Sequence, residues 1–306
     1  MAFNRLLDLV GDTVKTMLDK DDAPTKYNSS QYRNLIGFTG VSDGIGTSAF
    51  IAHLAMELQH NDTPVLIVDL NFNLPTMYSW FQSKEFDISR SLTQLLNTNA
   101  ADRLAEYTFR NADNGVSVVS PHIFKETPVS WCGITQQSIH DLLATARTHY
   151  AYVLVDLGSN FNINATMYGL WECNKIYTFT TPNEGHNSTL RSKRAYMEEY
   201  GKAQMLSDII ESMTLGDGKS AADWAAIKYN LIGSLPFDTD ISVCIRNFTP
   251  VTSVRLKSSA VSSYIKTVKS VASQIKNNCA IEKDFAEAIP DSQVTMGMKV
   301  QDVKDW

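Results

Sequence analysis

The sequence of 306 residues has few features that would tie the chain together covalently or anchor it in a membrane. Its four cysteines are spread out, and none lies within four residues of another. This spacing excludes a zinc site built on a close cysteine pair and favours free thiols in a reducing compartment. No apolar run approaches the ~18–20 residues of a membrane span. The N-terminus also lacks the basic-then-apolar pattern of a signal peptide, so we expect a cytoplasmic protein.

Positive charge is also scarce. The chain has 27 Lys+Arg against 33 Asp+Glu and a formal net charge of -6, which disfavours a nucleic-acid partner held by overall charge. A local basic patch remains open in the C-terminal helical region, although a solvated helix face is the simpler interpretation. The basic residues there are Arg255, Lys257, Lys266, Lys269 and Lys276.

Hydrophobic residues make up 43% of the chain, enough for a globular core that needs no disulfide or metal. We expect an amphipathic helix in residues 1–20, a polar linker in 21–32, one α/β domain in 33–280 and a C-terminal extension in 281–306. The charges of the first helix sum to zero, which favours docking to a protein partner over binding to a membrane surface. Packing onto its own domain is the alternative. The expected partner-binding anchors are Phe3, Leu6, Leu7 and Val10.

From residue 34 onward, short apolar runs alternate with helical patterns. Continuous apolar strands between helices indicate strands buried on both faces. The fold class is therefore α/β, a doubly wound and mostly parallel sheet with helices on both faces. The expected strands are 35–38, 65–68, 116–119, 152–155, 176–180 and 229–232, and the clearest helices are 50–58, 136–148 and 261–275.

The segment from Gly40 to Ser48, between an expected strand and an expected helix, looks like a phosphate loop. A turn followed by a helix N-terminus presents backbone amides to an anion. The glycine spacing and Ser48 fit the pattern G-x-x-x-x-G-K-[ST], in which the hydroxyl holds magnesium. Thr47 replaces the lysine, and losing that charge removes a contact worth roughly 1.5–3 kcal/mol.

Asp43 adds a negative charge that would face a polyphosphate. This repulsion outweighs the attraction of a helix terminus, which is roughly 0.3–1 kcal/mol. From the loop alone, a plain strand-turn-helix junction explains the residues as well as a nucleotide site does. The candidate cofactor-binding residues of the loop are Gly40, Ser42, Asp43, Gly44, Gly46, Thr47 and Ser48.

Two acids, Asp69 and Asp156, end apolar runs at positions where open α/β sheets bind ligands. They are candidate site residues, and simple polar strand ends are the alternative.

Four segments in this order resemble the ParA/MinD family of deviant-Walker ATPases. That family has K-G-G-x-G-K-[ST] after its first strand, and here Ser42 and Thr47 stand in place of both lysines. Residues 64–71 resemble its second strand with the switch I acid, and residues 152–158 resemble its Walker B and switch II strand. Residues 233–238 are similar to its Pro-x-Asp turn.

The resemblance implies P-loop NTPase architecture and a role for each motif. Ser48 and Asp156 would organise magnesium if nucleotide binds, Asp69 would place the attacking water, and Pro236 and Asp238 would lie near the base. With both lysines lost, we expect Asp69 and Asp156 to be vestigial and ATPase activity to be absent or very weak. No cofactor is expected, or ATP or ADP with magnesium bound weakly. Ser42 cannot make the lysine contact that crosses the family's dimer interface, so any homodimer should be nucleotide-independent.

Within the family, the chain most resembles the TadZ/CpaE pilus-assembly branch, whose loops often read G-G-x-G-x-S. The resemblance implies a pseudo-ATPase that positions or scaffolds a membrane-associated secretion, conjugation or pilus machine, recruited by protein partners to the inner face of the membrane. One alternative is an active ATPase with a relocated cation, from Lys84, Arg90, Arg191 or a partner. The other is a DNA-partition protein.

Overall fold

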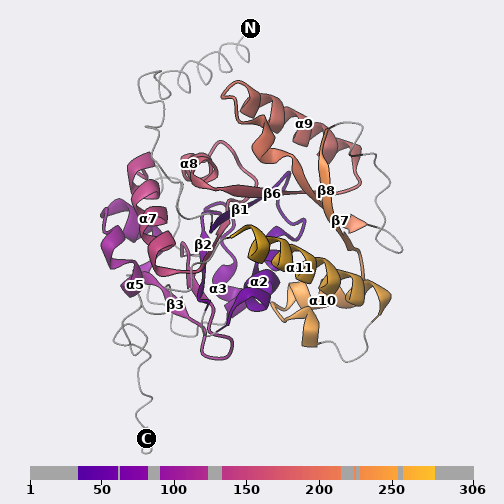
Figure 1. The fold of residues 1–306 in the computed structure, drawn as a ribbon, viewed down its shortest axis with the longest axis horizontal. Coiled ribbons are helices and arrows are strands. Elements are labelled where there is room, and N and C mark those ends of the chain that lie inside the picture. Colours follow the sequence, from indigo (N-terminus) through magenta and orange to yellow (C-terminus); the bar gives the residue numbers. More distant parts are fainter. Residues whose placement is uncertain are drawn as a thin grey trace, which may run out of the picture. The chain divides into compact units, whose positions relative to one another are not determined.

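Eight strands form one sheet in the part of the chain that the computed structural model describes, namely residues 34–60, 63–81, 90–122, 133–214, 224, 228–253 and 258–279. Their order is β3-β4-β2-β5-β1-β6-β7-β8, and every neighbouring pair is parallel except β3 with β4 (Figure 1). The strands are β1 (Leu35–Gly40), β2 (Val65–Asp69), β3 (Phe109–Arg110), β4 (Ser117–Val119), β5 (Tyr152–Asp156), β6 (Lys175–Thr180), β7 (Asp208–Thr214) and β8 (Asn230–Pro236).

Helices cover both faces of this sheet (Figure 1). Helices α2 and α11 pack on one face and share a core with it, whereas α7 and α8 pack on the other. The helices are α2 (Thr47–Leu58), α3 (Met77–Phe81), α4 (Leu92–Asn97), α5 (Leu104–Tyr107), α7 (Gln136–His149), α8 (Asn164–Glu172), α9 (Glu184–Glu198), α10 (Thr239–Arg246) and α11 (Ser259–Asn278), with short 3₁₀ turns η3 (Ala101–Arg103), η4 (Ala203–Leu206) and η5 (Val251–Ser253).

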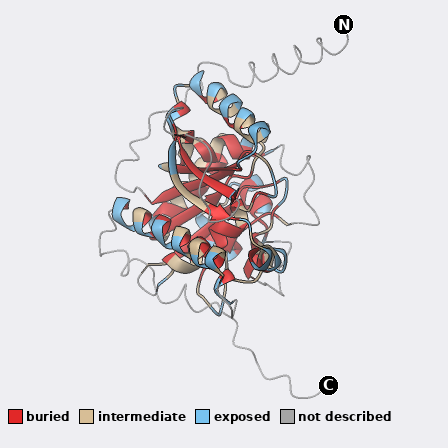
Figure 2. Cartoon of the chain, turned by 90° about the vertical axis from the view of Figure 1, so that its right-hand side faces the viewer, coloured by how far each residue is buried: buried red, intermediate tan, exposed pale blue. Residues whose placement is uncertain are grey.

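The core has two layers because side chains of a strand point alternately to opposite faces. On β2, Ile67 belongs to the layer under α2, and Leu66 and Val68 belong to the layer under α7. All five residues of β2 and of β5 are buried, which explains their unbroken apolar runs. The buried residues form a continuous central slab in Figure 2.

The predicted fold class is confirmed, with differences in β3 at one edge of the sheet and in β7 and β8 toward the other. Strands β3 and β7 were not predicted: β3 has only two residues, and Glu211 and Ser212 interrupt the apolar run of β7. Strand β8 also continues to Pro236, so residues 233–236 are strand and the turn begins after them. The predicted helix 1–20, linker 21–32 and extension 281–306 lie outside the described residues.

The topology places the phosphate-loop segment at the centre of the sheet. Strand β1 lies between β5 and β6; the chain runs from β1 to β2 on one side of it and later crosses from β5 to β6 on the other. Ligands bind at such a switch point in open α/β sheets. Within the described residues, no helix combines the length and the apolarity needed to cross a bilayer.

We predict that Gly37→Ala destabilises the fold. The added Cβ would lie 2.7 Å from the Cys173 sulfur and 2.9 Å from Leu157 Cδ1, both buried. Overpacking of this kind costs roughly 1–3 kcal/mol of unfolding free energy, measurable by urea denaturation. Gly133→Ala is the control, because its Cβ would meet only Asn97 Oδ1, at 3.4 Å. Equal stability of the two variants would contradict the prediction.

Candidate functional site

The loop between β1 and α2 forms an open cradle. Gly44 and Gly46 have φ angles of 76° and 94°, values that residues with a side chain rarely adopt. A Cβ added at either glycine would meet no atom within 4 Å. Helix α2 then begins at Thr47 with no acid in its first turn, so its N-terminal partial charge is not offset by a side chain of that turn. This geometry favours an anion.

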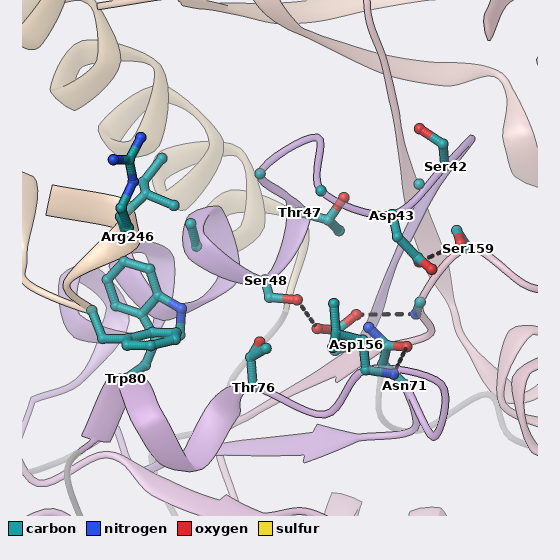
Figure 3. Close-up of a pocket in the computed structure, with 18 residues that line it drawn as sticks. Ser42, Asp43, Thr47, Ser48, Asn71, Thr76, Trp80, Asp156, Ser159 and Arg246 are labelled. Atoms are coloured by element: carbon teal, nitrogen blue, oxygen red, sulfur yellow. Dashed lines mark hydrogen bonds between the residues drawn. The ribbon is translucent and has the colours of Figure 1, made fainter. Parts of the chain in front are cut away.

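A cavity of about 240 Å³ adjoins the cradle and is lined by the loop and by residues that follow β2 and β5 (Figure 3). The buried Thr47 hydroxyl has no hydrogen-bond partner among the described residues. The Ser48 hydroxyl donates to Asp156 Oδ2 at 2.5 Å, and the Gly158 N–H donates to Asp156 Oδ1 at 3.0 Å. The structure therefore brings together the two residues predicted to hold magnesium.

Asp156 is fully buried beside Asp69 on the neighbouring strand. Burial raises the pKa of Asp156 to about 6, although hydrogen bonds from Ser48 and Gly158 oppose this rise. Burial and the charge of Asp156 raise the pKa of Asp69 well above its ordinary value. Two adjacent buried acids therefore cost stability when ionised.

Asp69 does not line the cavity, which differs from its predicted place beside an attacking water. Its carboxylate accepts hydrogen bonds from the Ser120 hydroxyl (2.8 Å) and from the N–H groups of Asn71 (3.1 Å) and Met77 (3.4 Å). The side chain therefore supports the turn that leads into α3. Asn71 stands at the cavity wall instead.

Asp43 points away from Thr47 toward the segments that follow β2 and β5 (Figure 3). Its Oδ1 accepts a hydrogen bond from the Ser159 hydroxyl at 2.5 Å, and its Oδ2 accepts one from Asn73 Nδ2 at 2.7 Å. The predicted negative charge in the loop is therefore present and is held by two neutral donors.

Lys193 on α9 reaches the loop, a contact that does not follow from the sequence. Its ammonium donates to the Gly40 carbonyl at 2.9 Å and to the Ser159 carbonyl, and lies 4.4 Å from the centre of the Phe161 ring. Burial lowers the pKa of Lys193 to about 8, while the charge of Asp43 acts in the opposite direction. The Lys193 ammonium therefore binds backbone carbonyl oxygens beside the cradle.

Ser42, at the first lysine position of the family pattern, is also bonded within the chain. Its hydroxyl lies 3.3 Å from His186 Nε2, and the Thr181 hydroxyl lies 2.7 Å from His186 Nδ1. His186 and Lys193 are seven residues apart on α9 and so share one helix face. The sequence contains this shared face, but it does not show that the face packs against the loop.

A second cavity of about 250 Å³ shares Gly44 and Gly46 with the first. Pro236 and Asp238 line it, and its wall is largely apolar. Asp238 Oδ1 caps α10 by accepting the N–H groups of Asp240 and Ile241. The apolar wall comprises Ile45, Met213, Leu235, Phe237, Ile241 and Ile245.

Arg246, at the end of α10, lines both cavities and is exposed. The relocated cations predicted from the sequence lie elsewhere: Arg191 pairs with Glu184 on the surface of α9, and Arg90 is exposed just before α4. Lys84 is outside the described residues.

Basic residues on α11 were candidates for nucleic-acid contact. Lys266, Lys269 and Lys276 are all exposed on this helix, whereas Arg255 and Lys257 lie outside the described residues. None of these three lysines lines either cavity.

No family model and no curated protein sequence matches the chain. Solved structures do match. A ParA family ATPase from Chlorobium tepidum has a TM-score of 0.63 at 20% identity, over 78% of this chain and 99% of that one. The septum site-determining protein MinD with Mg-ADP, from Pyrococcus horikoshii, has a TM-score of 0.63 at 16% identity, over 80% and 99%. The chain has the ParA/MinD fold. A MinC:MinD cell division complex from Aquifex aeolicus matches at 13% identity with a TM-score of 0.56, over 78% of this chain and 95% of that one.

The cradle of this ParA/MinD fold fits a phosphate in shape, because a Cβ added at Gly44 or Gly46 would meet no atom within 4 Å, and the buried Thr47 hydroxyl has no partner among the described residues. Its charge does not fit a triphosphate, because Asp43 and Asp156 line the cavity and residue 47 is not a lysine. Among the described residues, no group of three or more His, Cys, Asp or Glu side chains is placed to hold a metal.

We predict that Asp156→Asn stabilises the protein above pH 6. A raised carboxyl pKa means that the folded state binds more protons than the unfolded state between about pH 3.8 and 6, so stability falls as pH rises through this window. The variant should match the natural protein near pH 4 and exceed it by roughly 1–3 kcal/mol at pH 8. Thermal unfolding across this range tests the prediction, with the exposed Asp113→Asn as control. A variant less stable at every pH would contradict it.

Proposed function

We propose that this chain is a ParA/MinD-like pseudo-ATPase, of the TadZ/CpaE type, that positions or scaffolds a membrane-associated secretion, conjugation or pilus machine. The observation that carries the proposal is a complete fold around a phosphate loop that has lost its cations. Residue 47 is a threonine with a buried hydroxyl, and Asp43 brings a carboxylate to the cavity wall.

The remaining chemistry supports weak or absent nucleotide binding. A phosphate in the cradle would meet backbone amides, the Thr47 hydroxyl and the N-terminus of α2. The second cavity, beside Pro236, has apolar walls suited to a base. Without a loop lysine, the transition-state charge of phosphoryl transfer lacks its main stabilising group. In this proposal the chain keeps the fold and its cavities but lacks the cation needed for efficient phosphoryl transfer.

Protein partners supply the second half of the proposal. The MinC:MinD complex shows that a protein of this fold can bind another protein. The anchors Phe3, Leu6, Leu7 and Val10 give residues 1–20 an apolar stripe with the spacing used by helices that dock in grooves. Partners bound in this way would recruit the chain to the inner face of the membrane. Any homodimer would be nucleotide-independent, because Ser42 is bonded to His186 of its own chain and carries no charge.

An active ATPase is the second candidate, and Arg246 favours it. Its side chain lines the cavities on both sides of Gly44 and Gly46. A guanidinium there could supply the charge that the loop lacks. This reading requires Arg246 to turn toward the phosphates, whereas the pseudo-ATPase reading requires no rearrangement.

We predict that Thr47→Lys strengthens the weak nucleotide binding of the natural protein. Restoring the cation should tighten binding of ADP or ATP with magnesium by at least roughly tenfold, measured by isothermal titration calorimetry. Thr47→Met is the control, because it adds length without charge. If the natural protein already hydrolyses ATP with magnesium, Thr47→Lys changes nothing and Arg246→Gln abolishes turnover, then the pseudo-ATPase proposal is wrong.

We also predict that the N-terminal anchors are required for partner binding. The intact chain should capture envelope or secretion components from its native host, and Leu6→Asp with Val10→Asp should abolish this capture. The melting temperature should stay nearly unchanged. Asp8→Asn, on the polar side of the same predicted helix, should capture normally. Recovery of no such components, or full capture by the double variant, would overturn this part of the proposal.

A further inference from the structure

Asp43 joins the phosphate loop to both segments that face it. Through Oδ1 it holds Ser159, three residues after β5, and through Oδ2 it holds Asn73, four residues after β2. These segments form the cavity wall opposite the cradle, with Asn71 and Gly158. One carboxylate on the loop thus bridges the ends of two strands that lie side by side in the sheet.

Lys193 adds a second connection at the same place. It donates to Gly40 at the start of the loop and to the carbonyl of Ser159, the residue whose hydroxyl bonds to Asp43. Burial lowers the pKa of this ammonium, and the charge of Asp43 acts to raise it. The segment after β5 is therefore held to the loop by two side chains of opposite charge.

In nucleotide-dependent switch proteins, the terminal phosphate is the anion that orders two such segments. We propose that Asp43 is a built-in substitute for that phosphate, so that the segments after β2 and β5 are held on the loop without nucleotide. This inference rests on the proposed function and adds its regulation: the switch is held in one state by the chain itself. Protein partners would then meet the same surface whether or not nucleotide is present.

The same placement defines which ligand the site can still accept. A phosphate group beside Gly44 and Gly46 would meet no atom within 4 Å of an added Cβ and would face the N-terminus of α2, whose first turn has no acid. Asp43 and Asp156 also line the cavity, and their carboxylates repel a further phosphate. The cavity therefore favours a nucleoside diphosphate over the corresponding triphosphate.

Hydrogen exchange of residues 71–76 and 158–163 in the full chain tests the built-in anion. Without nucleotide, Asp43→Ala should speed exchange in both segments at least roughly tenfold, while β1 and β5 keep their protection. Ser159→Ala should speed exchange in the segment after β5 alone, because it removes one hydrogen bond and leaves the charge. Adding ATP with magnesium to the natural protein should leave both segments unchanged. Unchanged exchange in Asp43→Ala, or new protection by ATP in the natural protein, would overturn the inference.

Calorimetry tests the ligand preference separately. ADP should bind the natural protein more tightly than ATP, and Asp43→Asn should remove at least roughly a tenfold difference between them, since it removes the repelling charge. Ser159→Ala should keep the preference. A natural protein that prefers ATP would contradict the inference. Failure of the proposed function would appear differently, as ATP turnover or absent partner capture, with the exchange pattern of Asp43→Ala still as expected.

Discussion

The site depends on two backbone hydrogen bonds at the end of β1. The N–H of Gly40 donates to the carbonyl of Gly158 at 3.1 Å, and the N–H of Val41 donates to that of Phe179 at 2.9 Å. Each bond joins the start of the loop to a segment of a different neighbour of β1. Together the two bonds fix the direction in which the loop leaves the sheet. The cradle glycines, the first turn of α2 and the acid at the end of β5 take their relative positions from this junction. Close packing beneath it, with Gly37 against Cys173, leaves no room for a shift of the strand.

The sequence was sufficient for the parts of the fold that rest on burial of unbroken apolar runs. Strand β5 appeared at its predicted residues because every side chain in it is buried. Strand β7 was not predicted because Glu211 interrupts its apolar run. This acid is buried in the structure, but the sequence pattern does not show that burial. Its burial is a property of the assembled sheet, which no local pattern contains.

Some contacts of the candidate site could likewise be predicted from the sequence, and others could not. Contact between Ser48 and Asp156 follows from strand ends that meet at one edge of a parallel sheet, so it could be predicted. The sequence could not show that Asn71, rather than Asp69, lines the cavity. That outcome depends on the direction in which each side chain points after the strand ends. Lys193 comes from a helix about 150 residues beyond the loop in the sequence and reaches it only through tertiary packing. Such a site keeps buried acids at a cost in stability, which is common where local rules give way to function.

The two edges of the sheet also limit how this chain can associate with others. On one edge, β3 has only two residues and runs antiparallel to its neighbour. On the other, β8 has seven residues and ends at Pro236, which removes the backbone N–H at that one position. The β3 edge, with two residues, offers few backbone groups and so resists growth of the sheet by pairing with a second chain. At that edge, assembly into a larger structure is directed away from strand addition, toward contacts made by helices and loops.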